Sequence, residues 1–67
     1  MVEIELNNKQ TKRFWNDSCE AVGWDILNLD NYLCNKYTII KRQWTSNRNL
    51  ILTIEDEQYA TWLLLYL

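Results

Sequence analysis

The densest group of potentially reactive side chains is a run of three carboxylates, Glu55, Asp56 and Glu57. Neighbouring carboxylates can act as a general acid and a general base, or they can hold a divalent cation. The same run also suits the start of a helix, because Asp is a preferred N-cap residue and Glu in the first turn complements the helix dipole. We interpret Asp56 as a helix cap and Glu57 as a first-turn residue, with no catalytic role.

The residue types that most enzymes require are missing from the sequence. The chain has no histidine, two cysteines and one glycine, so it offers no imidazole base, no Cys-His pair and no complete set of zinc ligands. Gly23 follows a predicted helix and does not belong to a phosphate-binding loop. Cys19 is expected to be a small buried hydrophobe, and Cys34 an ordinary thiol. We therefore predict no enzymatic activity, no metal, no cofactor and no small-molecule substrate.

A second group combines three cations and one tryptophan near a predicted turn, and its members are Lys41, Arg42, Trp44 and Arg48. Aromatic rings that stack on bases, next to cations that bind phosphate, can hold single-stranded nucleic acid. The formal net charge of -2 supplies no general attraction for nucleic acid. A solvated hairpin with Trp44 partly packed is the favoured interpretation, and single-stranded nucleic-acid binding is the alternative.

The elements at the start of the chain follow clear periodicities. Apolar residues alternate with Glu3 and Glu5, which predicts a strand over residues 2–6 with one solvated face. From Asn8 onward the apolar residues recur at helical spacing. This pattern predicts an Asn-capped helix of about four turns that ends at Gly23.

The middle of the chain divides into an irregular part and a hairpin. Residues 24–37 fit neither the helical nor the strand period, so we predict irregular structure with one or two helical turns that Asp30 could cap. Two β-branched and aromatic segments, residues 37–44 and 50–54, flank a polar loop over residues 45–49. This arrangement predicts an antiparallel hairpin.

The inward faces of the two hairpin strands follow from the period of two in a strand. In the second strand, we expect Leu50, Leu52 and Ile54 to face the core. The first strand leaves two alternatives open, because either the even-numbered residues from 38 to 44 or the odd-numbered residues from 37 to 43 could face inward.

The last predicted helix is apolar on more than one side. Residues at intervals of three and four form one apolar stripe, and they are Tyr59, Trp62, Leu63, Tyr66 and Leu67. Trp62, like Trp15 on the first helix, lies on such a stripe and is expected in the core. Leu64 and Leu65 widen the apolar arc beyond what one sheet face covers. We expect this surplus to be covered by a partner or by a second copy of the chain.

Taken together, these elements predict one small α+β domain over residues 1–67. Its expected core is a three-stranded, mainly antiparallel sheet with two amphipathic helices on one face, in the order β-α-irregular-β-β-α. At 67 residues a single core only just outweighs chain entropy, and four Trp, four Tyr and one Phe supply bulk in place of disulfides. No apolar run approaches the roughly 18 residues of a membrane span, and no secretory signal follows Met1. We therefore expect a soluble, cytoplasmic protein.

The C-terminal part of the chain resembles a signature found in small uncharacterised proteins of tailed cyanobacterial viruses (cyanophages). In those proteins an alternating strand leads to an acidic cap and then to a helix with Ala-Thr, a bulky residue and alternating apolar residues. The matching positions are Leu52, Ile54, Asp56, Ala60, Thr61, Trp62, Leu64 and Tyr66. The resemblance implies a viral origin and helices on a small sheet, but it implies no activity.

The sequence as a whole favours a non-enzymatic protein–protein interaction module. If the chain is viral, it would bind and modulate a host protein in the host cytoplasm, or it would self-associate as a homodimer. The residues that we expect to contact the partner are Trp24, Tyr32, Tyr37, Leu64, Leu65 and Leu67. They are large apolar or aromatic side chains, the kind enriched at the energetic centres of interfaces.

Overall fold

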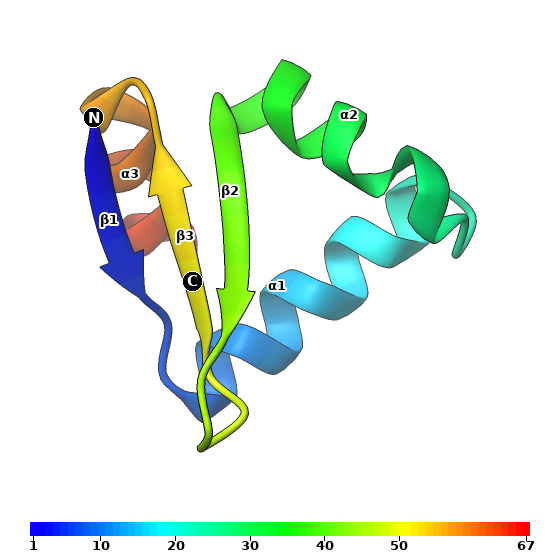
Figure 1. The fold of residues 1–67 in the computed structure, drawn as a ribbon, viewed down its shortest axis with the longest axis horizontal. Coiled ribbons are helices and arrows are strands. Elements are labelled where there is room, and N and C mark those ends of the chain that lie inside the picture. The colour runs from blue at the N-terminus through cyan, green and yellow to red at the C-terminus, as the bar shows by residue number, and fades with distance from the viewer.

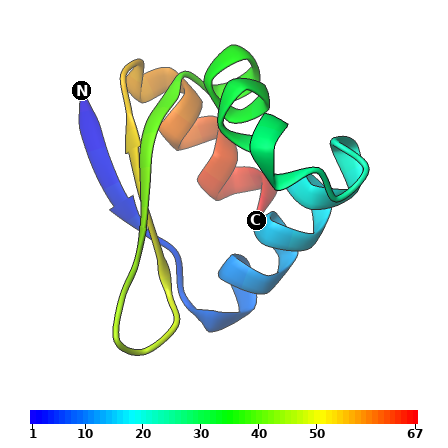
Figure 2. The same ribbon diagram turned by 45° about the vertical axis from the view of Figure 1, so that its right-hand side comes forward.

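The computed structural model describes residues 1–67, which form three strands and three helices. In chain order the elements are β1 (Val2–Glu5), α1 (Asn8–Ala21), α2 (Ile26–Tyr37), β2 (Ile39–Trp44), β3 (Leu50–Ile54) and α3 (Glu57–Tyr66). The strands form one antiparallel sheet in the order β1-β3-β2 (Figure 1). All three helices lie on the same side of this sheet (Figure 2). The predicted α+β class and antiparallel sheet are confirmed, and a third helix is added.

Both ends of α1 are closed by local hydrogen bonds that the sequence encodes. At the start, the Gln10 N–H donates to Asn7 Oδ1 at 2.8 Å, and the Asn7 N–H donates to Gln10 Oε1 at 3.0 Å. This reciprocal pair is a capping box. At the end, Gly23 has a φ of 63°, and the Trp24 N–H donates to the Cys19 carbonyl at 2.7 Å. The predicted stop at Gly23 is confirmed, because a left-handed glycine lets the chain turn back on the last carbonyls.

The prediction of an irregular segment over residues 24–37 is wrong, because α2 is a continuous helix. Its cap is Asp25 and not Asp30, since the Leu27 N–H donates to Asp25 Oδ1 at 3.1 Å. The buried positions of α2 are Leu29, Leu33 and Tyr37. They are spaced by four residues and form one narrow stripe that packs against α1 and the sheet.

A bulge in β2 decides which residues of that strand face the core. Ile39 pairs with Ile54 and Lys41 pairs with Thr53, so Ile40 is an extra residue between them. The bulge shifts the alternation by one position. As a result Ile39 lies on the same side as Arg42 and Trp44, facing the helices, while Lys41 faces away from them. Neither of the two regular alternatives describes β2 along its whole length.

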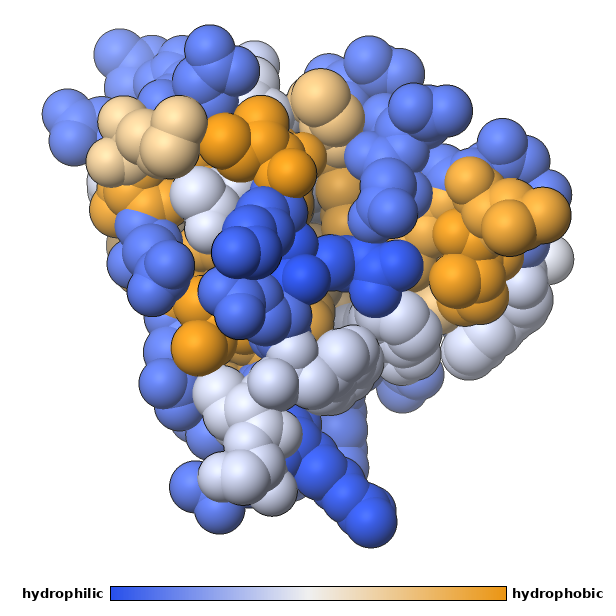
Figure 3. All heavy atoms as spheres, in the orientation of Figure 1, coloured by the Kyte–Doolittle hydropathy of each residue, from blue (hydrophilic) through white to orange (hydrophobic).

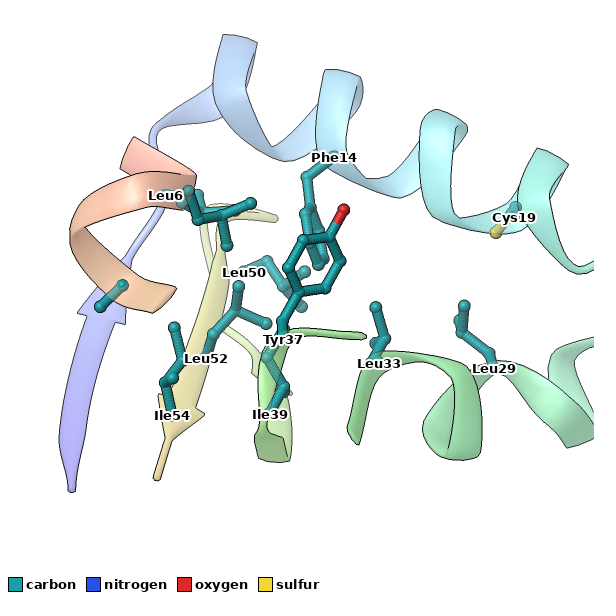
Figure 4. Close-up of a cluster of buried hydrophobic side chains, with 12 residues drawn as sticks. Leu6, Phe14, Cys19, Leu29, Leu33, Tyr37, Ile39, Leu50, Leu52 and Ile54 are labelled. Carbon is teal, nitrogen blue, oxygen red and sulfur yellow. The ribbon is translucent and has the colours of Figure 1, made fainter. Parts of the chain in front are cut away.

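The core lies between the sheet and the helices and contains Leu6, Phe14, Cys19, Leu29, Leu33, Tyr37, Ile39, Leu50, Leu52, Ile54, Ala60 and Leu63. In Figure 4, Leu29 and Leu33 from α2 point toward α1, and Cys19 from α1 points toward them. Phe14 and Tyr37 meet in the middle, with ring centroids 5.9 Å apart. The inward orientation predicted for the alternate residues of β3 is confirmed, because all three are fully buried.

One buried hydroxyl joins three separate parts of the fold. Thr11 of α1 donates from Oγ1 to the Leu6 carbonyl at 3.2 Å and accepts from the Leu50 N–H at 3.1 Å. Leu6 follows the end of β1, and Leu50 is the first residue of β3. The hydroxyl therefore satisfies two buried polar groups that would otherwise lack partners.

Candidate interaction surfaces

More large hydrophobic side chains are exposed on α3 than on any other element. This helix buries Ala60 and Leu63 against the sheet. Five large side chains on its other sides are exposed, and they are Tyr59, Trp62, Leu64, Leu65 and Tyr66. We call these five residues the α3 face. It includes Leu65, which is 82% exposed. The apolar residues that the sequence predicted to be more than one sheet face could cover therefore lie on the molecular surface.

The expectation that Trp62 belongs to the core is wrong, because its side chain is 51% exposed. One side of its ring packs against Tyr37 at 5.9 Å, and it stacks on Tyr66 at 5.9 Å with only 6° between the planes. The Tyr66 hydroxyl donates to Asp17 Oδ2 at 2.7 Å, and the Arg13 guanidinium lies 5.0 Å from the Tyr66 ring centre. The hydrogen bond to Asp17 raises the pKa of Tyr66. The rings of Trp62 and Tyr66 are therefore held in place by residues of α1 and α2.

A shallow groove of about 460 Å³ borders the α3 face where α2 ends and α3 begins. On its α2 side, Lys36 Nζ donates to the Tyr32 hydroxyl at 3.0 Å and lies 5.3 Å from the Tyr37 ring centre. The hydrogen bond that Lys36 donates to the Tyr32 hydroxyl raises the pKa of Lys36, and burial raises the pKa of Tyr37. Tyr32 and Tyr37, both predicted to contact a partner, thus support Lys36 and the core.

The six predicted partner-contact residues do not form a single surface. Leu64 and Leu65 are exposed on α3, whereas Tyr37 is buried. Tyr32 and Leu67 are half-buried and pack against the core. A single partner surface could therefore contact only some of the six predicted residues.

The remaining predicted contact, Trp24, belongs to a separate apolar patch where α2 begins. It is 57% exposed, and its neighbours Ile26 and Leu27 are 44% and 93% exposed. We call these three residues the α2 corner. Figure 1 places this end of α2 far from α3, and Figure 3 shows apolar side chains gathered at the same end of the molecule. The chain thus carries two distinct apolar surfaces.

The structure separates the four residues predicted for nucleic-acid binding. Lys41 lies on the open side of the sheet, opposite Arg42 and Trp44. Arg42 Nε donates to Asp30 Oδ1 at 2.8 Å, and its guanidinium lies 5.5 Å from the Trp15 ring centre. Arg42 is therefore already engaged within the protein and supports Trp15.

Two residues of α1 that were not predicted for this site lie next to Trp44 and Arg48. Lys12 and Trp15 line a groove of about 320 Å³ between α1 and the hairpin, together with Trp44 and Arg48. The rings of Trp15 and Trp44 meet edge to face, with centroids 5.2 Å apart. Lys12 and Trp15 are three residues apart on one helix, so their spacing shows that they share a side. Their proximity to the hairpin, however, depends on tertiary packing.

The carboxylates and cysteines have structural surroundings. Asp56 caps α3 as predicted, since the Gln58 N–H donates to its Oδ1 at 3.0 Å, and Glu57 lies in the first turn. Cys19 is buried, and this burial raises the pKa of its thiol. No three Cys, Asp or Glu side chains lie close enough together to hold a metal ion. None of the helices combines the length and the apolar composition needed to cross a membrane.

Neither a protein-family model, nor a curated protein, nor a solved structure matches this chain. The viral origin implied by residues 50–66 therefore stays a prediction. Evidence on function comes from the two apolar surfaces and the groove beside the hairpin.

Proposed function

We propose that this chain is a non-enzymatic interaction module that binds a protein through the α3 face. The observation that carries the proposal is that one helix of 10 residues leaves five large apolar side chains exposed. Monomeric proteins rarely expose large apolar patches to water, and groups of exposed apolar side chains commonly mark interaction sites.

The geometry of the α3 face suits insertion into a groove on the partner. Trp62 and Leu65 are three residues apart and both point away from the buried side of α3. Apolar anchors at this spacing are how an amphipathic helix fills a hydrophobic groove. The contacts of Trp62 with Tyr37 and Tyr66 fix its ring before binding, which reduces the entropy lost on association.

The charges at the start of α3 favour a partner with basic residues at one end of its groove. Glu55, Asp56 and Glu57 are all exposed and lie where the α3 face begins. Complementary charges at the rim of an interface speed association and fix its orientation. The proposed partner surface is therefore an apolar groove with Lys or Arg near the end that receives the start of α3.

The proposal includes the viral origin implied by the resemblance of residues 50–66. In that setting the partner is a host protein in the cytoplasm of a cyanobacterial cell, and binding modulates that protein. A second copy of the chain is the other possible occupant. Light scattering on the purified protein separates these two cases, because only self-association gives a dimer without added host protein.

Two matched double variants test the proposal. Trp62→Ala with Leu65→Gln changes the α3 face, and Trp24→Ala with Leu27→Gln makes the same changes on the α2 corner. Trp62 and Trp24 have similar exposure, 51% and 57%, as do Leu65 and Leu27, 82% and 93%. Each variant serves as bait in a cyanobacterial lysate, and retained proteins are quantified by mass spectrometry relative to the wild type.

We expect the wild type and the α2-corner variant to retain the same partner. The α3 variant should lose about tenfold or more of it, because buried Trp anchors commonly contribute most of the binding energy. If self-association is the function, the same variant should convert a dimer into a monomer. Equal retention by all three proteins, or loss with the α2-corner variant alone, contradicts the proposal.

A further inference from the structure

The groove between α1 and the hairpin differs in charge from the other two grooves of the molecule. The groove between α2 and β2 contains Asp30, and the groove beside α3 contains Asp56. The third groove is lined by two cations, Lys12 and Arg48, and has no carboxylate in its lining. The groove between α2 and β2 also contains Lys41 and Arg42, but Arg42 is paired there with Asp30. The third groove is therefore the one that combines two cations with no carboxylate.

Its two cations are available for a ligand. The only salt bridge in the protein joins Arg42 to Asp30, and both Lys12 and Arg48 are exposed. They approach the groove from different elements, Lys12 from α1 and Arg48 from the hairpin loop. Two separate cations on the walls of one groove can contact successive phosphates or two oxygens of one phosphate.

The same groove offers an aromatic surface next to these cations. Trp44 is 48% exposed, and its ring is supported by Trp15 at 5.2 Å in an edge-to-face contact. Trp15 is held in turn by the Arg42 guanidinium, which Asp30 fixes in place. Trp44 therefore presents a supported ring that a planar base can stack on.

We propose that this groove binds single-stranded nucleic acid, with one base stacked on Trp44 and the adjoining phosphates contacted by Lys12 and Arg48. The exposed amides of Asn8 and Asn16, which also line the groove, can donate to a base edge or to phosphate. The volume of about 320 Å³ is at the small end for ligand sites, so the groove takes one or two nucleotides.

The small number of cations sets the expected salt dependence. For a single strand, log K falls with log salt at a slope of about -0.7 for each phosphate neutralised, so two contacts give about -1.4. Raising the salt concentration fourfold should therefore weaken binding about sevenfold. A nonspecific field does not explain such binding, because the net charge of the chain is -2.

The test uses fluorescein-labelled oligothymidylate of eight nucleotides and fluorescence anisotropy at low salt. Trp44→Ala should weaken binding at least about fivefold through the lost stacking. Trp44→Phe, which keeps an aromatic ring, should restore most of the affinity. The matched controls are Trp24→Ala and Lys41→Ala, which change an exposed Trp and a cation outside the groove. Both should stay within about twofold of the wild type.

A second variant tests the phosphate contacts separately from stacking. Lys12→Ala with Arg48→Ala should bring the salt slope from about -1.4 close to zero, because both phosphate contacts are removed. The double variant of the α3 face, Trp62→Ala with Leu65→Gln, should bind the oligonucleotide like the wild type. This last comparison separates the groove from the proposed protein-binding surface.

Several outcomes overturn the assignment. These are absence of binding, equal loss in Trp44→Ala and Trp24→Ala, and an unchanged salt slope in the Lys12 and Arg48 variant. Thymidine monophosphate that competes as tightly as the eight-nucleotide strand assigns the groove to free nucleotides and overturns the assignment to strands. Unfolding curves confirm that each variant is folded at the assay temperature. If Trp44→Ala is unfolded, the variant of Lys12 and Arg48 still tests the proposal.

Discussion

α1 and α3 begin alike but divide their residues differently between core and surface. Both are capped by a polar side chain, Asn7 in α1 and Asp56 in α3, and both pack on the same side of the sheet. α1 buries four residues and exposes mainly charged and amide side chains. α3 buries two residues and exposes five large apolar ones. The fold therefore accounts for the sequence of α1 but for only one side of α3.

Stability does not explain the most exposed apolar residue of α3, Leu65, which is 82% exposed. Side chains that are exposed in both the folded and the unfolded chain gain little from folding, and contiguous apolar surface promotes association. Polar residues at these positions would keep the helix equally well, as they do on the exposed side of α1. We therefore propose that the apolar residues of the α3 face act outside the fold of one chain.

The largest expected effect separates the two sides of α3. Leu63 is fully buried and Leu65 is 82% exposed. Leu63→Ala should cost about 2 to 5 kcal/mol of unfolding free energy through lost contacts and a cavity. Leu65→Ala should stay within about 0.5 kcal/mol of the wild type. Urea unfolding curves measure both, and similar costs for the two variants would show that the exposed side of α3 contributes to the monomer's stability.

The next largest effect on unfolding free energy is expected from removing the hydroxyl of Thr11 in α1, compared with removing that of Thr61 in α3. Thr11→Val leaves the Leu6 carbonyl and the Leu50 N–H without their shared partner, and we expect a loss of about 1 to 3 kcal/mol. Thr61 is exposed, and its hydroxyl donates only to the Glu57 carbonyl of its own helix, at 3.4 Å. Thr61→Val should therefore change unfolding free energy by less than about 0.5 kcal/mol. Equal effects in thermal unfolding would refute this role of Thr11.

The caps test the feature that the two helices share. Asn7→Ala and Asp56→Ala should each cost about 1 kcal/mol, because each leaves helix N–H groups without a side-chain acceptor. Asn7→Ala should cost somewhat more, since the reciprocal bond from the Asn7 N–H to Gln10 also depends on the box geometry. Urea unfolding checks both values. No loss in either variant would mean that tertiary packing alone holds the helix starts.

The smallest effect concerns the contact between α1 and the α3 face at high pH. The hydrogen bond to Asp17 raises the pKa of Tyr66 in the folded state above the value of about 10 expected when unfolded. Folding therefore favours the protonated phenol. This contribution to stability is complete below pH about 10 and is lost as the pH rises through the folded-state pKa.

Tyr66→Phe removes this titration but keeps the ring stacked on Trp62. The unfolding midpoint of the wild type should fall more steeply above pH 10 than that of the variant, when both are measured from pH 8 to pH 11.5. Burial, the main cause of the raised pKa of Tyr37, is the same in both proteins. Parallel curves would show that the bond between Tyr66 and Asp17 is not maintained in solution.

The hairpin, α1 and α3 could be predicted from the sequence because their residue periodicity and capping residues agree with the burial seen in the fold. The alternation in β3, Asp56 at the cap and Gly23 at the stop each point to one structure. α2 was missed because exposed Ile26 and Leu27 add apolar residues outside its buried stripe and blur the helical period. The extra residue in β2 likewise has no signature in the sequence, since its position depends on pairing with β3.

The candidate surfaces could be predicted only in part. The apolar surplus on Leu64 and Leu65 was visible, but α3 is apolar on almost every side, so the spacing could not show that Trp62 lies outside the core. The cluster around Trp44 was also incomplete. Lys12 and Trp15 join it through the packing of α1 against the hairpin, which no local pattern encodes.

The most direct test of the central claim places a photo-crosslinking amino acid at position 65, with position 27 as the control. Both positions are strongly exposed leucines on the surface of a helix, so the probe should not disturb the fold at either. Irradiation in a cyanobacterial lysate should give one discrete adduct from position 65, with a host protein or with a second copy, and none of that mass from position 27. Absence of an adduct from position 65, or the same adducts from both positions, would contradict the claim that the α3 face is a docking surface.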